Sequence, residues 1–137
     1  MTYTIEWVEN GCVIAVRGEA TNGDVEALVV ELGGSPQLDQ LHFVLHDLRQ
    51  VTQASIDTEL IDMSAYTNAA VSSYTRRVRE AFVLGNGLMA RYVRHYIEQS
   101  REAGSQWEFG VFATMDEACR WVGRPASDRS AHLTRDE

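Results

Sequence analysis

The sequence predicts a single-domain α/β fold, with a mixed five-stranded sheet and about four helices in the order β-β-α-β-α-β-α-β-α. Two alternating apolar segments flank a turn signal near the start of the chain, which indicates an antiparallel hairpin. Short apolar runs then alternate with segments of helical periodicity, as in sheets whose parallel strands are joined by crossover helices. A chain of 137 residues suits one buried core.

The hairpin and the first helix carry the clearest local signals. Residues 3–8 and 12–18 are the expected strands, because the turn dipeptide Asn10–Gly11 lies between them. Thr21 and Asp24 have the spacing of a capping box, which predicts a helix start. The apolar positions that follow repeat at helical spacing until two glycines end the pattern: Val25, Leu28, Val29 and Leu32.

The next strand is expected at the centre of the sheet. Residues 41–48 form a short apolar run, which is typical of a strand covered on both faces. A second helix is predicted from residue 56 to about residue 74, with Ser55 as its N-cap. Asp57 and Glu59 then fall in the first turn, where the helix dipole favours acidic side chains.

The rest of the domain repeats the strand-and-helix alternation. Residues 77–84 have strand character, residues 85–87 break it, and a third helix follows from residue 88 to about residue 104. Residues 107–113 form the last strand. The last helix starts at the capping box of Thr114 and Glu117 and ends before Gly123. The predicted domain spans residues 1–123, and the polar, aperiodic segment 124–137 is predicted to be a flexible tail.

Composition argues against several classes of partner. The net charge is −8, and residues 1–70 hold 11 acids and two bases, so nucleic acid is not an expected partner. No apolar run is long enough to span a membrane, and the first residues lack a signal-peptide pattern. Cys12 and Cys119 are predicted to be buried thiols, which suits a cytoplasmic location.

Motifs for catalysis and metal binding are missing from the sequence. There is no G-x-S-x-G elbow and no C-x-x-C pair, and no cofactor is expected. His42 and His46 share one face of the predicted central strand, but four residues separate them by about 13 Å, too far to share a metal. His95 is expected on an exposed helix face and His132 in the tail. A non-enzymatic protein is therefore predicted.

Two polar groups remain as candidate binding residues. Asp47 and Arg49 are expected at the carboxyl end of the central strand, where open α/β sheets often bind ligands; the alternative is an ion pair that fixes the loop. Gly85, Asn86 and Gly87 begin a G-x-G-x-x-A pattern at a helix start. The acidic residue that a dinucleotide site needs is absent from the end of the next strand, which favours a tight turn.

The apolar stripe of this third helix includes Tyr92 and Tyr96, which are predicted to be core residues.

Several short stretches resemble the SpoIIAA-like branch of the STAS superfamily. They are Y-x-I-E-W from Tyr3, G-E-A-T from Gly18, H-D-L-R-Q-V-T from His46 and F-G-V-F-A-T-M-D-E-A-C-R-W-V from Phe109. The resemblance covers residues 3–123 and implies a small cytoplasmic α/β domain. It also implies kinship with anti-sigma-factor antagonists, which bind partner kinases and are phosphorylated on a serine in a D-S-x-G-like motif.

The phosphorylation motif is absent from this chain. Aligning the segment from Asp47 places Ser55 at the Asp of the motif, Ile56 at its Ser and Thr58 at its Gly. The sequence thus predicts a regulatory module without the switch, which recognises another protein, or itself, through a sheet edge or residues 49–57. A binder of small anions or nucleotides is the alternative. The candidate residues are Asp47, Arg49, Ser55, Asp57, Gly85, Asn86 and Gly87.

Overall fold

A computed structural model describes residues 2–123, and the predicted flexible tail at 124–137 lies outside the described residues. The five strands and four α-helices confirm the predicted fold class and element order. In chain order they are β1 (Thr2–Val8), β2 (Gly11–Thr21), α1 (Asn22–Gly33), β3 (Phe43–Ser55), α2 (Thr58–Ser72), β4 (Arg79–Val83), α3 (Ala90–Glu102), β5 (Glu108–Phe112) and α4 (Met115–Val122), with a short 3₁₀ helix η1 (Leu38–Gln40) before β3.

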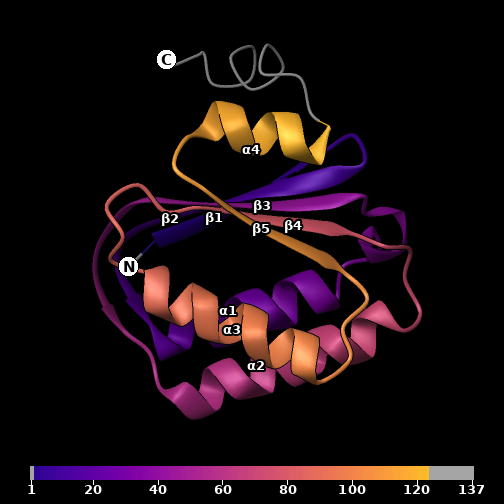
Figure 1. The fold of residues 1–137 in the computed structure, drawn as a ribbon, viewed down its shortest axis with the longest axis horizontal. Helices are drawn as coiled ribbons and strands as arrows, with labels where there is room; N and C mark the ends of the chain where they lie inside the picture. Colours follow the sequence, from indigo (N-terminus) through magenta and orange to yellow (C-terminus); the bar gives the residue numbers. More distant parts are fainter. Residues whose placement is uncertain (1, 124–137) are drawn as a thin grey trace.

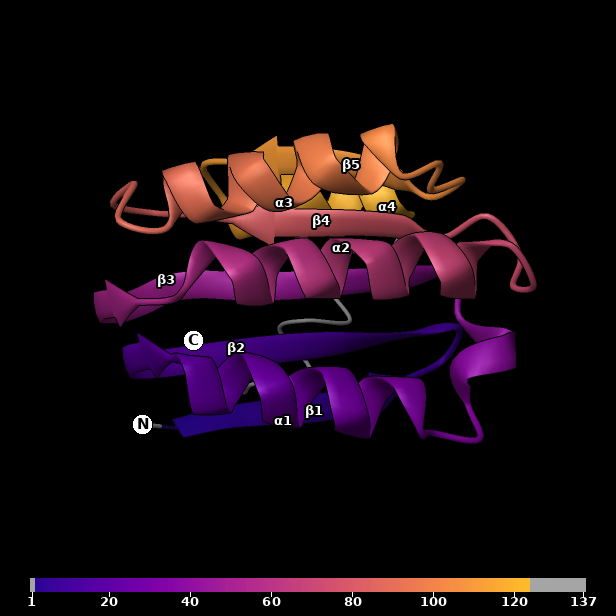
Figure 2. The ribbon, with the colours of Figure 1, turned by 90° about the horizontal axis from the view of Figure 1, so that it is seen from below.

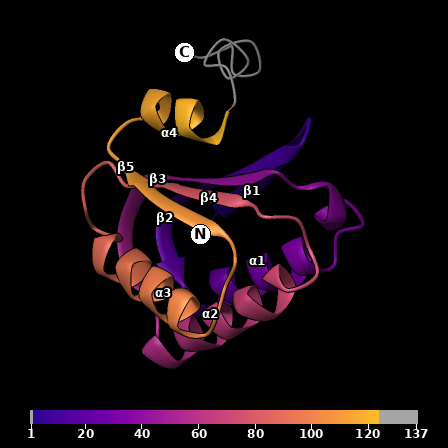
Figure 3. The same ribbon diagram turned by 45° about the vertical axis from the view of Figure 1, so that its right-hand side comes forward.

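The sheet has the strand order β1-β2-β3-β4-β5, so β3 is central, as predicted. β1 runs antiparallel to β2, and every later neighbour pair is parallel. Helices α1, α2 and α3 cover one face of the sheet and α4 lies on the other (Figure 1), an arrangement that the rotated view in Figure 3 repeats. The domain is therefore a three-layer structure with unequal helical layers.

The hairpin between β1 and β2 depends on Asn10 and Gly11. Asn10 has a φ of 70°, a left-handed conformation that asparagine tolerates better than most residues. Gly11 already pairs with Val8, and a Cβ atom at Gly11 would overlap the ring of Phe43. Glycine is thus required there by close packing in the sheet and not by its backbone angles.

The predicted capping box is complete at α1, whereas at α4 the contacts described show its N-cap half, with the Glu117 carboxylate accepting from the Thr114 hydroxyl at 3.2 Å. The Thr21 hydroxyl accepts from the Asp24 amide, and the Asp24 carboxylate accepts from the Thr21 amide at 2.9 Å. At α4, the Thr114 hydroxyl accepts from the Glu117 amide at 3.2 Å, and Gly123 ends the helix with a φ of 84°. Each cap satisfies amide groups that the first helical turn leaves without an intrahelical acceptor.

The predicted end of the central strand was wrong. β3 continues to Ser55, because β2 is also long and pairs with it up to Thr21 and Ser55. β4 ends at Val83, so the part of β3 beyond residue 48 is more exposed. Polar side chains are therefore tolerated in this part of the strand. Ser55 is consequently not a helix cap. α2 begins at Thr58, with Asp57 at its N-cap position.

Alternating side chains of the sheet divide the core into two layers. Val44 and Leu48 of β3 face α1 to α3, whereas Phe43 and Leu45 face α4. Cys12 belongs to the larger layer and Cys119 to the α4 layer, and both are buried, as predicted. Within residues 2–123, no helix is both long and apolar enough to cross a membrane.

Candidate functional site

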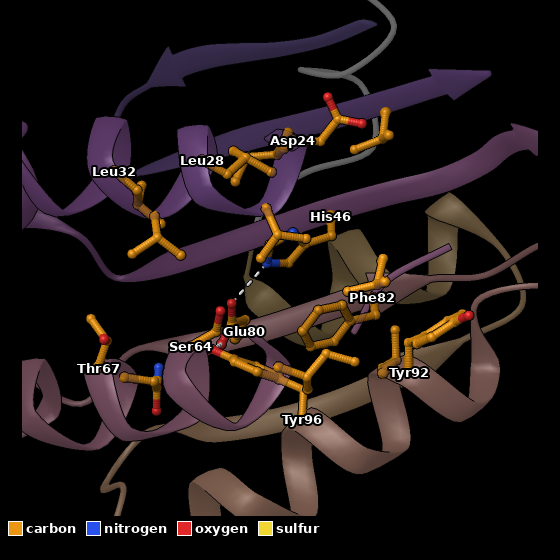
Figure 4. A pocket seen from close by; sticks show the side chains of 18 of the residues that line it. Asp24, Leu28, Leu32, His46, Ser64, Thr67, Glu80, Phe82, Tyr92 and Tyr96 are labelled. Carbon is orange, nitrogen blue, oxygen red and sulfur yellow. Dashed lines mark hydrogen bonds and ion pairs between the residues drawn. The ribbon is translucent and has the colours of Figure 1, made fainter. Parts of the chain in front are cut away.

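A cavity of about 200 Å³ lies between the sheet and the helices α1, α2 and α3. Figure 4 shows side chains from all three helices and from β3 and β4 pointing into it. Most of the lining is aliphatic or aromatic. The polar exceptions include Asp24, His46, Ser64, Thr67, Asn68 and Glu80.

The cavity exists because α1 does not bury its apolar stripe completely. Leu28 and Leu32 are only partly buried, although the helical spacing correctly placed them on the inner face. Seen from the helical side in Figure 2, α1 and α2 lie side by side, and they pack against each other less closely than α2 and α3 do. The apolar side of α1 therefore faces the cavity.

A network of His46, Glu80 and Tyr96 forms the polar part of the cavity wall. His46 Nε2 lies 2.7 Å from Glu80 Oε2, and the Tyr96 hydroxyl donates to Glu80 Oε1 at 3.0 Å. Glu80 is only 3 % exposed. The parallel register of β3 and β4 pairs His46 with Phe82, so their rings stack with centroids 4.4 Å apart. Alternation along β4 then points Glu80 to the same face as Phe82.

Burial controls the protonation of two groups near Glu80. Desolvation, followed by the charge of Glu80, raises the pKa of the Tyr96 phenol well above its ordinary value, so its hydroxyl remains a donor. Burial also raises the pKa of the Cys12 thiol to about 12, and Glu80 adds to that effect. Among the described residues, no arginine lines the cavity, so His46 is the lining side chain able to carry positive charge.

Motif searching missed this network because its members come from three separate elements. The available signal was weaker: the ionisable residue His46 directly follows the apolar run Phe43–Leu45, and Glu80 directly precedes the apolar run Ala81–Val83. Burying an ionisable side chain is costly unless it is paired, so each of them required a partner. Tyr96 was predicted only as a core residue, and it does pack against the core.

The predicted pair of Asp47 and Arg49 forms an ion pair on β3 itself. Arg49 Nε and Nη2 donate to the two Asp47 oxygens at 2.8 Å and 2.9 Å, and this hydrogen bonding raises the pKa of the guanidinium. Asp47 lies within the strand and not at its carboxyl end, which corrects the prediction. A Cβ atom at Gly85 would lie 3.1 Å from Arg49 Cα, so the ion pair and the glycine turn are neighbours.

The glycine turn is held by its own asparagine. Asn86 Oδ1 accepts from the Leu88 amide at 3.0 Å, and Asn86 Nδ2 donates to the Val51 carbonyl at 3.3 Å. Gly85 and Gly87 have φ values of 69° and 79°, the left-handed region that favours glycine. These contacts agree with the tight turn that the sequence favoured.

Ser55 and Asp57 do not belong to that turn, because Ser55 is the last residue of β3 and Asp57 is at the N-cap position of α2. Asn22 at the start of α1 donates to Asp57 Oδ2 at 3.1 Å and accepts from the Asp57 amide at 2.9 Å. Ile56, between the two candidate residues, is partly buried and lines the cavity. The predicted site residues are thus divided between two places in the fold.

His95 is not on an exposed helix face, contrary to the prediction. Its Nε2 atom lies 2.7 Å from Asp62 Oδ1, so the pair joins α3 to α2. The sequence did not indicate this contact, because its periodicity does not show which helix packs beside another. Among residues 2–123, no group of three or more His, Cys, Asp and Glu side chains is arranged to hold a metal ion.

The outer surface of α2 carries exposed apolar side chains. Met63 is 64 % exposed and Tyr66 is 60 % exposed, three residues apart on one side of the helix. Tyr74, just beyond the end of α2, is 66 % exposed. Methionine and tyrosine are enriched at protein interfaces, so this surface, Met63 with Tyr66 and Tyr74, is a candidate contact area.

Comparison with solved structures shows that the chain has a SpoIIAA-like fold, which confirms the predicted resemblance at the level of the fold. The anti-sigma factor antagonist SpoIIAA in its unphosphorylated form matches with a TM-score of 0.57 and 15% identity, over 89% of this chain and 98% of that one. The phosphorylated form of SpoIIAA from Bacillus, described as a cell fate determinant, matches with a TM-score of 0.55 and 14% identity, over 88% and 99%.

An uncharacterized protein of the DUF3478 family from Shewanella loihica, described as having a SpoIIAA-like fold, is also similar. Its TM-score is 0.50 and its identity 16%, over 88% of this chain and 92% of that one. No protein-family model and no curated protein matches the sequence. The likeness to these solved structures therefore concerns the fold.

Proposed function

Starting from this SpoIIAA-like fold, we propose that the protein is a non-enzymatic regulatory module that works by binding another protein. The proposal rests on the match with an anti-sigma factor antagonist, which extends over 89% of this chain and 98% of that protein. Regulation by phosphorylation at the family's serine position is not part of the proposal, since Ile56 has no hydroxyl group. A reducing cytoplasm is the proposed location, because it suits buried thiols.

The proposed contact surface combines residues 49–57 with the exposed side of α2. Ser55 at the end of β3 and Asp57 at the N-cap of α2 are exposed, and Met63 and Tyr66 continue the surface along the helix. An interface of this kind has apolar anchors at its centre and polar groups at its rim. Residues 49–57 alone would provide the polar groups of the rim but not the apolar anchors of the centre.

The partner is proposed to be a different protein with a basic surface. From Arg49 to Ser72 the chain contains the acids Asp57, Glu59 and Asp62 and one base, Arg49, which is already paired with Asp47. A second copy of a chain with a net charge of −8 would be repelled, whereas a positively charged surface would be attracted. Self-association through the same surface is therefore the less favoured outcome.

Photo-crosslinking in the native cell tests this surface. We expect benzoylphenylalanine at position 66 to give one discrete adduct with another protein, because Tyr66 lies at the centre of the proposed contact. The matched control is benzoylphenylalanine at Val111, an apolar residue of β5 that is 49 % exposed. Adding Glu59→Arg to the position 66 variant should weaken adduct formation about tenfold or more if the partner is basic.

Three outcomes would contradict the proposed surface. An adduct with the mass of two copies of this chain would show self-association. An adduct at position 111 alone would place the contact at the sheet edge. Equal adduct yields with and without Glu59→Arg would remove the argument for a basic partner.

A small anion bound near Arg49 is a second candidate function, favoured by the closeness of Arg49 to Gly85. Such an anion would compete with Asp47 for the guanidinium, so weak binding is expected. Phosphate or citrate at millimolar concentration should raise the melting temperature of the wild type, and Arg49→Gln should remove that increase. No increase in the wild type would end this hypothesis.

A further inference from the structure

We infer that the cavity beneath α1 and α2 binds a neutral aromatic molecule of one or two rings that carries one hydrogen-bond donor, such as a phenol or an indole. The inference concerns a surface different from the proposed protein contact, and it does not depend on that proposal. It rests on the size of the cavity, on the charges of its wall and on the arrangement of His46, Glu80 and Tyr96 (Figure 4).

The size limits the ligand to a small ring system. The cavity measures about 200 Å³. An engineered apolar cavity of about 150 Å³ is known to admit benzene, so this space suits one ring with substituents or two fused rings. A lipid-sized chain would exceed it. The stacked rings of His46 and Phe82, together with the partly buried Tyr92, offer aromatic surface to such a ligand.

The wall favours a neutral molecule over an anion. Asp24 and Glu80 are the carboxylates of the lining, and His46 is already paired with Glu80 at 2.7 Å. The lining arginines that would stabilise a carboxylate or phosphate are absent among the described residues. An anion placed here would lose its hydration and meet negative charge, which raises its free energy in the cavity.

Glu80 explains why the ligand should carry a donor. Its two carboxylate oxygens offer about four acceptor positions, and His46 and Tyr96 are each directed at one oxygen. A donor on the ligand would add a hydrogen bond to a charged acceptor in an apolar surrounding, where such bonds are strong. A ring without a donor would gain only the contacts with the apolar wall.

The way in lies between α1 and α2. Thr67 on α2 is exposed and Ser64 is partly buried, and both line the cavity. The apolar side chains of α1 that face the cavity remain partly accessible, as expected for the wall of an open site. A filled core would have buried these side chains fully.

Three probes with similar rings test the inference by calorimetric titration at pH 7. We expect 2-naphthol to bind at one site per chain. Naphthalene, which lacks the donor, and 2-naphthoate, which is negatively charged, should each bind about tenfold more weakly or worse. Amide chemical shifts of the wild type with 2-naphthol should change most at Glu80, Phe82 and the inner side of α1.

A cavity-filling variant provides the matched control. Ser64→Leu adds volume into the cavity at a residue whose hydroxyl bonds only to the Leu60 carbonyl of its own helix in the contacts described. Binding of 2-naphthol should be lost in Ser64→Leu and kept in Tyr66→Ala, a change on the outer side of the same helix. The chemical-shift experiment on the wild type decides the matter if Ser64→Leu does not fold.

Four results would overturn the inference. They are the absence of saturable 2-naphthol binding, binding of 2-naphthoate that equals or exceeds it, unchanged binding in a folded Ser64→Leu variant, and shift changes located away from the cavity. None of these results bears on the crosslink expected from position 66, so the two proposals fail separately.

Discussion

Replacing His46 with leucine is expected to lower the free energy of unfolding by about 3 to 5 kcal/mol, because it removes one partner of a buried pair. Glu80 is 3 % exposed and would keep the Tyr96 hydroxyl as the other contact described at its carboxylate. Leucine fills a volume similar to that of the imidazole, so lost packing explains little of this cost. Urea unfolding of the wild type and the variant measures the difference.

A combined variant separates pairing from packing. His46→Leu, Glu80→Leu and Tyr96→Phe together replace the whole polar network by apolar groups, which in other proteins is often neutral or stabilising. We expect the triple variant to be more stable than His46→Leu alone. If His46→Leu costs less than about 1 kcal/mol, the pair contributes no more than an exposed contact would, and the network is not structurally important.

Alkaline conditions are expected to destabilise the protein through Cys12. Burial raises the pKa of this thiol from its ordinary value of 9.0 to about 12. Below pH 9 the thiol keeps its proton in both the folded and the unfolded chain, so it adds no pH dependence. Between pH 9 and 12 only the unfolded thiol ionises, and the free energy of unfolding falls by about 1.4 kcal/mol per pH unit from this group.

Two variants isolate the contribution of Cys12. Tyr96 also has a raised pKa, so the wild type should lose stability with pH through both groups. Cys12→Ser and Cys12→Ala remove the ionisable thiol and should flatten the profile by the same amount, although their stabilities at pH 7 will differ. A profile unchanged in both variants would show that Cys12 ionises in the folded protein as readily as in the unfolded chain. Denaturant unfolding at each pH provides the data.

Much of the fold could be predicted because its signals are local. The capping residues Thr21 and Thr114 and the asparagine of the hairpin act on their own neighbours, so their effects can be read from a few residues. The apolar run before Asp47 likewise predicted the central strand. Such signals determine where elements start and which face is buried.

The extension of β3 to Ser55 could not be predicted in this way. Its residues are mostly polar, and the strand persists because β2 supplies backbone partners along its whole length. Pairing of this kind depends on a strand some 30 residues away in the chain, which local propensity does not report. Ser55 therefore looked like a helix cap when it is still part of the sheet.

The candidate site was partly predicted. Asp47, Arg49 and the turn at Gly85 do lie together, although Asp47 and Arg49 are inside β3 and not after it. The meeting of His46 with Glu80 depends instead on the register between β3 and β4. A shift of one residue would turn Glu80 to the other face of the sheet, and no local pattern fixes that register. The cavity itself results from the incomplete packing of α1 against the rest of the domain, which depends on the tertiary structure and not on local sequence.

The strand order of the sheet has a consequence for how the chain assembles. Because neighbours in the sheet are neighbours in the sequence, each new strand joins an edge that is already formed, and no strand has to insert between two others. A chain emerging from the ribosome can therefore build this sheet in order. α4 is the last of the described elements to be synthesised, so the apolar side chains that it covers, Phe43, Leu45 and Val83, remain exposed longest. That surface is where nascent chains would first adhere to one another.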